Sequence, residues 1–321
     1  MINDKNKQNK NSFLKLTKIN ILFFLLIIFF FIQKKNDIKK KGNKKKKSEI
    51  KVGMCTIAKK ENRYIKYFVE FYKNLGYNHI FFYDNNDEGD ESISDLQIVK
   101  EGVKTGFISI TKFNKKKKRF ITGSYYDCYE KHNLEFDWIS FFDIDEFLIL
   151  EPNNSSIQGF LSNPLFNNCE SVKFNWRVFT DNDQIDYIDK PLMERFPIET
   201  KFKWENRHVK STFRGRLNYK KFKKNYSAHS IYDNVRACTS SGKKTDSNFY
   251  FWPPDFEKGS LNHYVTKSIR EFFYKKYKTK INVDEIPEKT KYYLFDYFFK
   301  INKKSKEKVD IFNHIFHTNY H

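Results

Sequence analysis

Residues 138–150, with the sequence WISFFDIDEFLIL, constrain the fold of this chain more than any other stretch. The apolar run at 138–142 is rich in β-forming residues and long enough for a buried strand. Acidic side chains follow it before the chain becomes apolar again, and these are Asp143, Asp145 and Glu146. Carboxylates are rarely buried unless they are paired or bind a metal. A divalent cation is the simplest partner for acids in such a core-like sequence.

The spacing of Asp143 and Asp145 allows two interpretations. On a regular strand, side chains two residues apart leave the same face, so both carboxylates would converge on one hard cation through oxygen. The alternative is a strand end with solvated acids, because a D-x-D sequence is common by itself. The sequence alone leaves both interpretations open.

The basic charge of the chain is unevenly distributed. The formal net charge is +21, but residues 1–51 hold fifteen lysines against three acidic residues. The remaining residues are only moderately basic, which suits an anionic substrate at least as well as a polynucleotide. The cysteines are far apart without a C-x-x-C spacing, so we expect isolated buried thiols at Cys55, Cys128, Cys169 and Cys238.

The N-terminal region predicts a membrane anchor. Residues 1–20 form a basic tail, and residues 21–33 contain the apolar run ILFFLLIIFFFI without a cleavage site of small residues after it. We therefore expect an uncleaved signal anchor, followed by a flexible basic stem at 34–49. Lysines flank both sides of the anchor and are more numerous after it, so the positive-inside rule favours a cytosolic body.

The body alternates strand and helix signals. This order predicts an α/β fold with a mostly parallel, doubly wound sheet, whose ligands sit beyond the carboxyl ends of the strands. We expect a catalytic domain at 50–285 and a helical, polar tail at 286–321. The predicted strands are 50–58, 78–83, 106–111 and 136–142, and the predicted helices are 62–75, 92–103 and 122–132.

Six segments of the body resemble glycosyltransferase family 92 and its family-2-like relatives of GT-A fold. They are VGMCTIAKKENRYIKYF, LGYNHIFFYDNND, SYYDCYEKHNLEFDWISFFDIDEFL, FNWRVF, MERF and HYVTKS, in the family's order within residues 51–278. The resemblance implies a metal-dependent transferase that uses Mn²⁺ or Mg²⁺ and a nucleotide-sugar donor, with a UDP-sugar expected. The acceptor would be a glycan or a glycoprotein.

The resemblance also assigns roles to individual residues. The expected metal ligands are Asp143, Asp145 and His263, with His229 as the second choice for the histidine. The expected contacts to the nucleotide-sugar, which include Asp143, are completed by Thr56, Glu61, Asp84 and Lys267. The alternative for Asp84 is an ordinary turn, and the alternative for His263 is a hydrogen-bonded structural histidine.

Transfer by a family of this type is expected to invert the anomeric centre, which requires a base for the acceptor hydroxyl. The sequence does not identify this base, and the candidates are Glu194 in MERF and Asp181 or Asp183 after WRVF. Trp176 and Arg177 are candidates for the acceptor side, because aromatic faces suit sugar rings. A plain core role for Trp176 is the alternative.

Two other functions remain as alternatives at this level. One is a membrane-tethered basic module that binds nucleic acid or acidic lipid, and the other is a metal-dependent nucleotidyl or phosphoryl transferase. The charge distribution argues against nucleic acid, and the lack of a Gly-rich phosphate loop argues against the second alternative. The resemblance implies a lumenal body in the Golgi or endoplasmic reticulum, where the sequons at Asn153, Asn154 and Asn225 would be usable.

Overall fold

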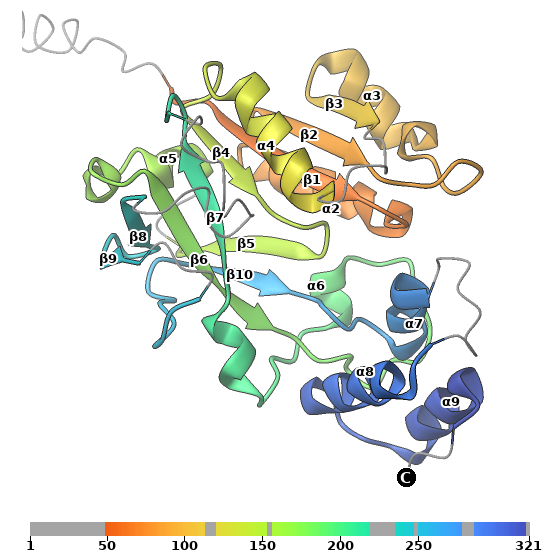
Figure 1. The fold of residues 1–321 in the computed structure, drawn as a ribbon. Coiled ribbons are helices and arrows are strands. Elements are labelled where there is room, and N and C mark those ends of the chain that lie inside the picture. The colour runs from red at the N-terminus through yellow and green to blue at the C-terminus, as the bar shows by residue number, and fades with distance from the viewer. Residues whose placement is uncertain are drawn as a thin grey trace, which may run out of the picture. The chain divides into compact units, whose positions relative to one another are not determined.

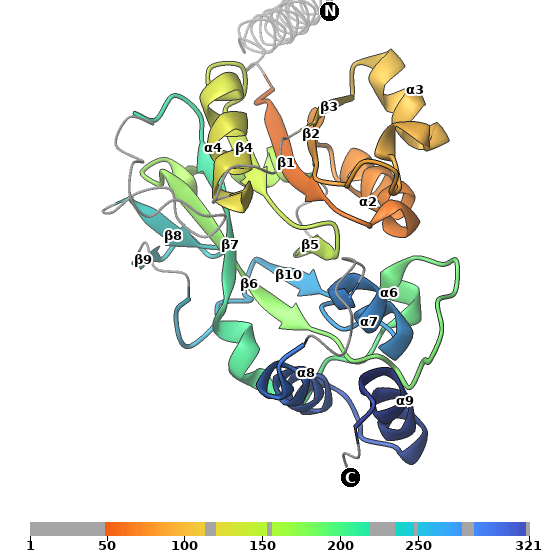
Figure 2. The same cartoon turned by 45° about the vertical axis from the view of Figure 1, so that its right-hand side comes forward.

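The computed structural model describes residues 49–112, 120–152, 156–218, 235–246, 250–277 and 286–318 (Figure 1, Figure 2). The predicted N-terminal tail and anchor, the stem up to residue 48, the asparagines of the sequons and His229 lie outside these residues. No helix in the described ranges is long and apolar enough to cross a membrane.

The first half of the body alternates strands and helices as predicted. Its strands pair in parallel in the order β3-β2-β1-β4, and the helices connect consecutive strands along the chain. The elements are β1 (Val52–Ala58), α2 (Asn62–Asn74), β2 (His79–Asp84), α3 (Gln97–Thr105), β3 (Ile108–Lys112), α4 (Phe120–His132) and β4 (Trp138–Phe141). The predicted helix start at Ser92 is wrong, because Ser92 instead precedes a short 3₁₀ turn, η1 (Ile93–Asp95).

The second half adds antiparallel strands, so the sheet is mixed rather than mostly parallel. The described sheet has ten strands, and β7 pairs antiparallel with both β4 and β6 while β10 pairs parallel with β6 and antiparallel with β5. The added strands are β5 (Glu146–Leu150), β6 (Ser171–Val178), β7 (Val209–Arg214), β8 (Ala237–Thr239), β9 (Lys244–Thr245) and β10 (Gly259–His263). The α/β class is confirmed, and the antiparallel strands correct the expected arrangement.

Helix α2 shows how the sequence pattern fixes the packing. Its apolar residues recur at helical spacing and form one buried face that includes Ile65, Phe68 and Tyr72. This face packs on the core beside the sheet, where the ring of Phe68 lies 6.2 Å from that of Phe147. The chain turns after the helix at Gly76, whose φ of +92° is readily adopted only by glycine.

The cysteines form disulfides, so the expectation of isolated thiols is wrong. Cys55 on β1 pairs with Cys128 on α4, and Cys169 before β6 pairs with Cys238 on β8. The partners are 73 and 69 residues apart in the sequence. Such long-range pairing leaves no local spacing signal, which is why the sequence did not reveal it.

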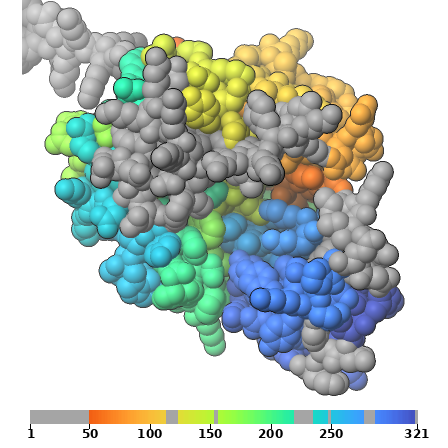
Figure 3. All heavy atoms as spheres, viewed as in Figure 1, coloured from red at the N-terminus to blue at the C-terminus, as the bar shows by residue number. Residues whose placement is uncertain are grey.

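The C-terminal helices share a core of their own. Helices α7 (Ile269–Tyr277), α8 (Glu288–Ile301) and α9 (Lys306–Phe316) bring together phenylalanine side chains, among them Phe272, Phe298 and Phe312. The ring of Phe272 lies 5.2 Å from that of Phe298, which ties α7 to α8. These helices form the blue part of the surface in Figure 3.

The remaining short helical elements lie in the connections between strands. They are α5 (Ile157–Leu161), η2 (Pro164–Phe166), α6 (Leu192–Arg195) and η3 (Lys203–Arg207). Segment η3 and helix α8 lie side by side in both views of the ribbon (Figure 1, Figure 2).

Candidate functional site

The carboxyl ends of the parallel strands β1, β2 and β4 meet at one edge of the sheet, as the sequence predicted. Asp143 and Asp145 lie at this edge, but in the turn between β4 and β5 rather than on a regular strand. Strand β5 pairs with β10 so that Glu146 stands opposite His263. The turn therefore brings the acidic stretch next to the late-chain segment HYVTKS.

Asp145 is the buried centre of a charged cluster. Its side chain is 2 % exposed, and its Oδ2 atom lies 2.7 Å from the Nζ of Lys267 and 2.5 Å from the Nζ of Lys275. Burial raises the pKa of Asp145, but the two ammonium groups outweigh it and hold the pKa well below the usual value. Asp145 is therefore ionised at neutral pH.

Lys275 on α7 connects Asp145 to the end of β1. Its Nζ also lies 3.0 Å from Oε1 of Glu61, and the lysine side chain is 37 % exposed. Sequence reasoning named Glu61 and Lys267 but missed Lys275, because a lysine within a basic helix carries no signal of its own.

Asp143 pairs with a different lysine. Its side chain is 43 % exposed, and its Oδ2 lies 2.6 Å from the Nζ of the buried Lys210 on β7. The Tyr125 hydroxyl donates to its Oδ1 over 3.0 Å. Burial raises the pKa of Asp143, but Lys210 outweighs this effect and the pKa falls below its usual value. Asp145 also acts on this pKa, so the two carboxylates share their surroundings.

Glu146 shapes the turn from inside. The backbone N–H of Asp143 donates to its Oε2 over 2.8 Å, and Lys210 lies 3.4 Å from the same oxygen. Burial raises the pKa of Glu146 to about 8 despite this lysine. The side chain is therefore largely protonated at neutral pH.

His263 ends strand β10 beside Asp145, with its Nε2 atom 3.8 Å from Oδ1 of Asp145. Burial lowers the pKa of His263 to about 3, although Asp145 opposes this effect, so the imidazole is neutral. A neutral imidazole has a lone pair for a metal, and carboxylates are the usual oxygen ligands. The donor types fit a divalent cation, but no three His, Cys, Asp or Glu side chains of the described residues already stand together as a metal site.

Buried polar atoms without hydrogen-bond partners gather around this centre. They include Oε2 of Glu61, Oε1 of Glu146 and Nδ1 of His263, none of which has a partner within the described part of the chain. The hydroxyls of Thr56 and Thr266 are in the same state. Each such atom costs about 1–3 kcal/mol when it stays unsatisfied, so their concentration here indicates a place for a polar ligand.

Two residues near the site have left-handed backbone. Lys60, which precedes Glu61, has a φ of +56°, and Lys267 has a φ of +52°. This conformation costs roughly 1–2 kcal/mol for a residue other than glycine, and such strain concentrates at functional sites. Both strained residues border the cluster around Asp145.

Asp84 lies at the end of β2, at the same edge, and is buried. Its Oδ1 accepts from the backbone N–H and the side-chain amide of Asn86, both over 2.9 Å. Lys112 lies 3.5 Å from its other oxygen. The contacts with Asn86 are typical of an ordinary turn. The position of Asp84 at the strand end would also suit a residue that binds the nucleotide.

The three base candidates lie in other surroundings. Asp181 is buried, and its Oδ2 lies 2.7 Å from the Nζ of Lys308 on α9. The exposed Asp183 contacts the same Nζ over 2.8 Å, and Glu194 is exposed on α6. No contact described by the structure joins any of these carboxyls to Asp143 or Asp145, so the role of each as a base stays a prediction.

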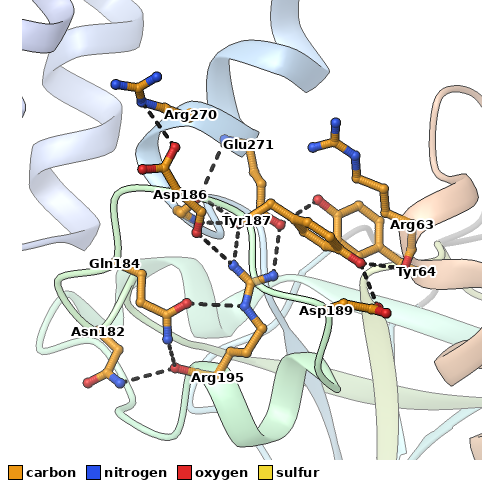
Figure 4. A network of polar contacts seen from close by, with 11 residues as sticks. Arg63, Tyr64, Asn182, Gln184, Asp186, Tyr187, Asp189, Arg195, Arg270 and Glu271 are labelled. Carbon is orange, nitrogen blue, oxygen red and sulfur yellow. Dashed lines mark hydrogen bonds and ion pairs between the residues drawn. The ribbon is translucent and has the colours of Figure 1, made fainter.

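Arg195 of the MERF segment forms a buried ion pair with Glu271, which lies three residues after HYVTKS (Figure 4). Arg195 of MERF points at Glu271, with one guanidinium nitrogen 2.5 Å from Oε2 and the other 2.9 Å from Oε1 (Figure 4). The Tyr64 hydroxyl donates to Oε1 over 2.7 Å. Hydrogen bonds that satisfy both partners make a buried pair tolerable. The pair joins α2, α6 and α7, and so holds Lys267 and Lys275 near the sheet edge.

Comparisons with known proteins give a distant structural neighbour. One similar solved chain is from the crystal structure of S. aureus TarS, with a TM-score of 0.36 and 10 % sequence identity. The alignment covers 83 % of this chain and 49 % of that chain, so this chain spans about half the length of TarS. The search of curated proteins found no match.

The family comparison covers most of the chain. The model of glycosyltransferase family 92 matches residues 48–300, which include all the strands described above and the complete charged cluster. The resemblance drawn from the sequence segments is thereby confirmed. The chain belongs to glycosyltransferase family 92, and the cluster around Asp145 is the candidate active site of a glycosyltransferase.

Proposed function

We propose that this glycosyltransferase uses a nucleotide-diphospho-sugar, with a UDP-sugar as the first donor to test, and transfers the monosaccharide to a hydroxyl of a glycan or glycoprotein. The observation that carries the proposal is the convergence of Lys267 and Lys275 on Asp145, beside the neutral imidazole of His263. We further propose that the body has the GT-A type of fold.

The charge balance of the cluster supports a diphosphate ligand that brings its own cation. Three carboxylates, on Glu61, Asp143 and Asp145, stand against three ammonium groups, on Lys210, Lys267 and Lys275. A bare diphosphate would upset this balance, whereas a diphosphate with a divalent cation adds little net charge. The lysines can then turn from the carboxylates to the phosphate oxygens as point charges.

Asp143, Asp145 and His263 would hold the cation, and Mn²⁺ or Mg²⁺ would neutralise charge on the leaving diphosphate when bound. Asp145 and His263 suit this role because one is ionised and the other is a neutral imidazole at neutral pH. Lys275 would pair with the diphosphate as the bond between the sugar and the phosphate breaks, because its partly exposed side chain already reaches the cluster at Asp145.

The end of β1 supports a nucleotide position. The hydroxyl of Thr56 and Oε2 of Glu61 are buried and lack partners within the described residues, so both are available for the nucleoside. Asp84 on the neighbouring strand would accept from ribose or base after releasing Asn86. These residues and Asp143 come from three adjacent strand ends, as expected for a nucleotide that lies across a sheet edge.

We also propose that the body faces an oxidising lumen. The disulfides Cys55–Cys128 and Cys169–Cys238 support this side, because such bonds are rare in the cytosol. The lysines that flank the predicted anchor favour the opposite side. An endoglycosidase shift at the three sequons, in cells that express the full chain, decides between the two orientations.

The functional test is a donor panel with product analysis. The protein is incubated with UDP- and GDP-sugars and Mn²⁺, and the released nucleotide is identified. Release of the nucleoside diphosphate, abolished by chelation, is the expected result. Release of a nucleoside monophosphate or of pyrophosphate would favour the nucleotidyl or phosphoryl transferase, and no turnover of any donor would contradict the proposal.

A further inference from the structure

A pocket of about 520 Å³ lies between η3, β6 and α8. Its walls are rich in aromatic rings, and its polar groups include two carboxylates and two lysines. The residues that matter for the argument are Trp176, Trp204, Glu205, His208, Tyr293 and Tyr297. In Figure 3 the green surface of the η3 region adjoins the blue surface of the C-terminal helices that form the other wall.

The pocket borders the charged cluster directly. The ring of Trp176, at the pocket wall, lies 4.2 Å from the ring of His263 and 5.1 Å from the ring of His208. Lys276 also lines the pocket and follows Lys275, the lysine that contacts Asp145. A molecule in the pocket would therefore lie within a side chain's length of the cluster.

The aromatic rings at the mouth of the pocket are exposed to solvent. Trp204 is 54 % exposed, and Tyr293 is 61 % exposed. Tyr293 stacks on Tyr297 at 6.0 Å with 19° between the rings. The guanidinium of Arg207 lies 3.8 Å from the ring centre of Trp204 and 4.6 Å from that of Tyr250, which extends the aromatic surface outward from the pocket.

We propose that this pocket is the acceptor subsite of the enzyme and that it binds a pyranose ring of a carbohydrate acceptor, with Trp204 and Tyr293 as the platforms for the sugar. The proposal rests on the function proposed above, since it presumes a donor at Asp145. It commits to a sugar rather than a peptide as the group that enters the pocket.

The chemistry of the walls matches a sugar ring. The C–H face of a pyranose is apolar and weakly positive, so it packs on the negative face of an aromatic ring. Its hydroxyl rim needs hydrogen-bond acceptors, which Glu205 and Asp296 provide at the wall. The mixture of rigid aromatic surface and a few polar groups is typical of small-molecule sites, and the volume is in their range.

His208 and Glu205 form a polar pair in the wall of the pocket. The Nε2 atom of His208 lies 3.4 Å from Oε2 of Glu205, and both side chains line the pocket together with Trp176.

The test uses adjacent tyrosines on α8 as a matched pair. Tyr293→Ala removes a platform, whereas Tyr292→Ala removes a ring that is 60 % exposed and lies outside the pocket lining. Both variants and Trp204→Ala are measured for binding to an array of glycans with UDP and Mn²⁺ present. Donor binding is measured with UDP alone by calorimetry, and the slow hydrolysis of the accepted UDP-sugar is followed in parallel.

We expect Tyr293→Ala and Trp204→Ala each to weaken glycan binding by roughly tenfold or more, while Tyr292→Ala matches the wild type. UDP affinity and donor hydrolysis should stay unchanged in all three variants. If Tyr293→Ala and Tyr292→Ala behave alike, or if the wild type binds no glycan while it binds UDP, the acceptor subsite is refuted. If the platform variants impair donor hydrolysis instead, the pocket holds the donor sugar and the inference is also refuted.

Loss of UDP binding in the wild type is a separate result, because it contradicts the proposed function rather than the assignment of the pocket. The two claims are therefore distinguished by which ligand fails to bind. Because the platform residues are exposed, we expect their variants to fold, and thermal unfolding of each variant checks this.

Discussion

The Nζ atom of Lys267 lies 2.7 Å from Oδ2 of Asp145, and both side chains are 2 % exposed. This pair joins the D-x-D turn to the segment HYVTKS, 122 residues later in the sequence. The lysine reaches the aspartate from a left-handed backbone with a φ of +52°. The strained backbone of Lys267 persists because contacts such as the ion pair with Asp145 stabilise it, and strained residues of this kind concentrate at functional sites.

The first prediction concerns Lys267→Met, which removes the ammonium group and keeps much of the side-chain volume. Charge-assisted contacts contribute about 1.5–3 kcal/mol, so we expect UDP to bind roughly tenfold to a hundredfold more weakly by calorimetry. Lys100→Met, at an exposed site on α3, is the control and should leave the affinity unchanged. Equal UDP affinity in the two variants would mean that Lys267 serves only as a structural partner of Asp145.

The second prediction concerns the pH dependence of stability. Burial raises the pKa of Glu146 to about 8 in the folded state, above its usual value of 4.5. The folded state then holds more protons than the unfolded state, so this contribution is full below pH 4.5 and is lost as the pH rises through about 8. The loss is at most about 5 kcal/mol.

Glu146→Gln should remove this contribution, because the amide does not ionise. The unfolding free energies of the wild type and the variant are measured by urea titration from pH 5 to pH 9. As the pH rises, the wild type should lose stability relative to the variant. The neutral His263 has the opposite effect, because it destabilises the fold as the pH falls below 6.5, the usual pKa of histidine. This effect is present in both proteins and cancels in the difference. A difference that does not vary with pH would show that the Glu146 carboxyl is ionised throughout.

The third prediction concerns the disulfide between Cys169 and Cys238, which closes a loop with a sequence separation of 69. Replacing both residues with alanine should lower the free energy of unfolding by about 3–4 kcal/mol, mainly because the unfolded chain gains freedom. Denaturant titration measures this loss. Free thiols at all four cysteines in the unreduced, denatured wild type would contradict both pairings, and with them the support for a lumenal body.

The fourth prediction tests whether two of the base candidates, Asp181 and Glu194, have a catalytic or only a structural role. Asp181→Asn removes the buried anion beside Lys308, whose ammonium keeps the exposed Asp183 as a charged partner at 2.8 Å, and breaking a buried pair costs up to about 3–5 kcal/mol. We therefore expect a large loss of stability, with the turnover per folded molecule reduced less than tenfold. The exposed Glu194→Gln should preserve stability. A loss of turnover beyond a hundredfold in either folded variant would identify that residue as the base.

The sequence predicted those parts of the fold that depend on local patterns. The apolar face of α2 and the alternation of strands and helices along the chain up to β4 followed from spacing alone. The positions of β7 and β10 did not, because antiparallel pairing between distant strands is decided by tertiary packing. The mixed sheet and the disulfides belong to this second class.

The site shows the same division. Asp143 and Asp145 stood out because acids interrupt an apolar run, and the family resemblance added Glu61, His263 and Lys267. Lys210 and Lys275 were missed, since a chain with 60 lysines and arginines gives no reason to single out two of them. Only the fold shows that these two ammonium groups reach the acidic turn.

The central claim is that the cluster around Asp145 binds a nucleoside diphosphate together with a divalent cation. The most direct measurement is the dissociation constant of UDP for the wild-type protein, by calorimetry, once with Mn²⁺ and once with EDTA. The account predicts that EDTA weakens UDP binding about a hundredfold or more, as expected when a cation offsets the charge of the diphosphate, and that Asp145→Asn removes the dependence on Mn²⁺. Tight UDP binding that is equal in Mn²⁺ and EDTA would contradict it.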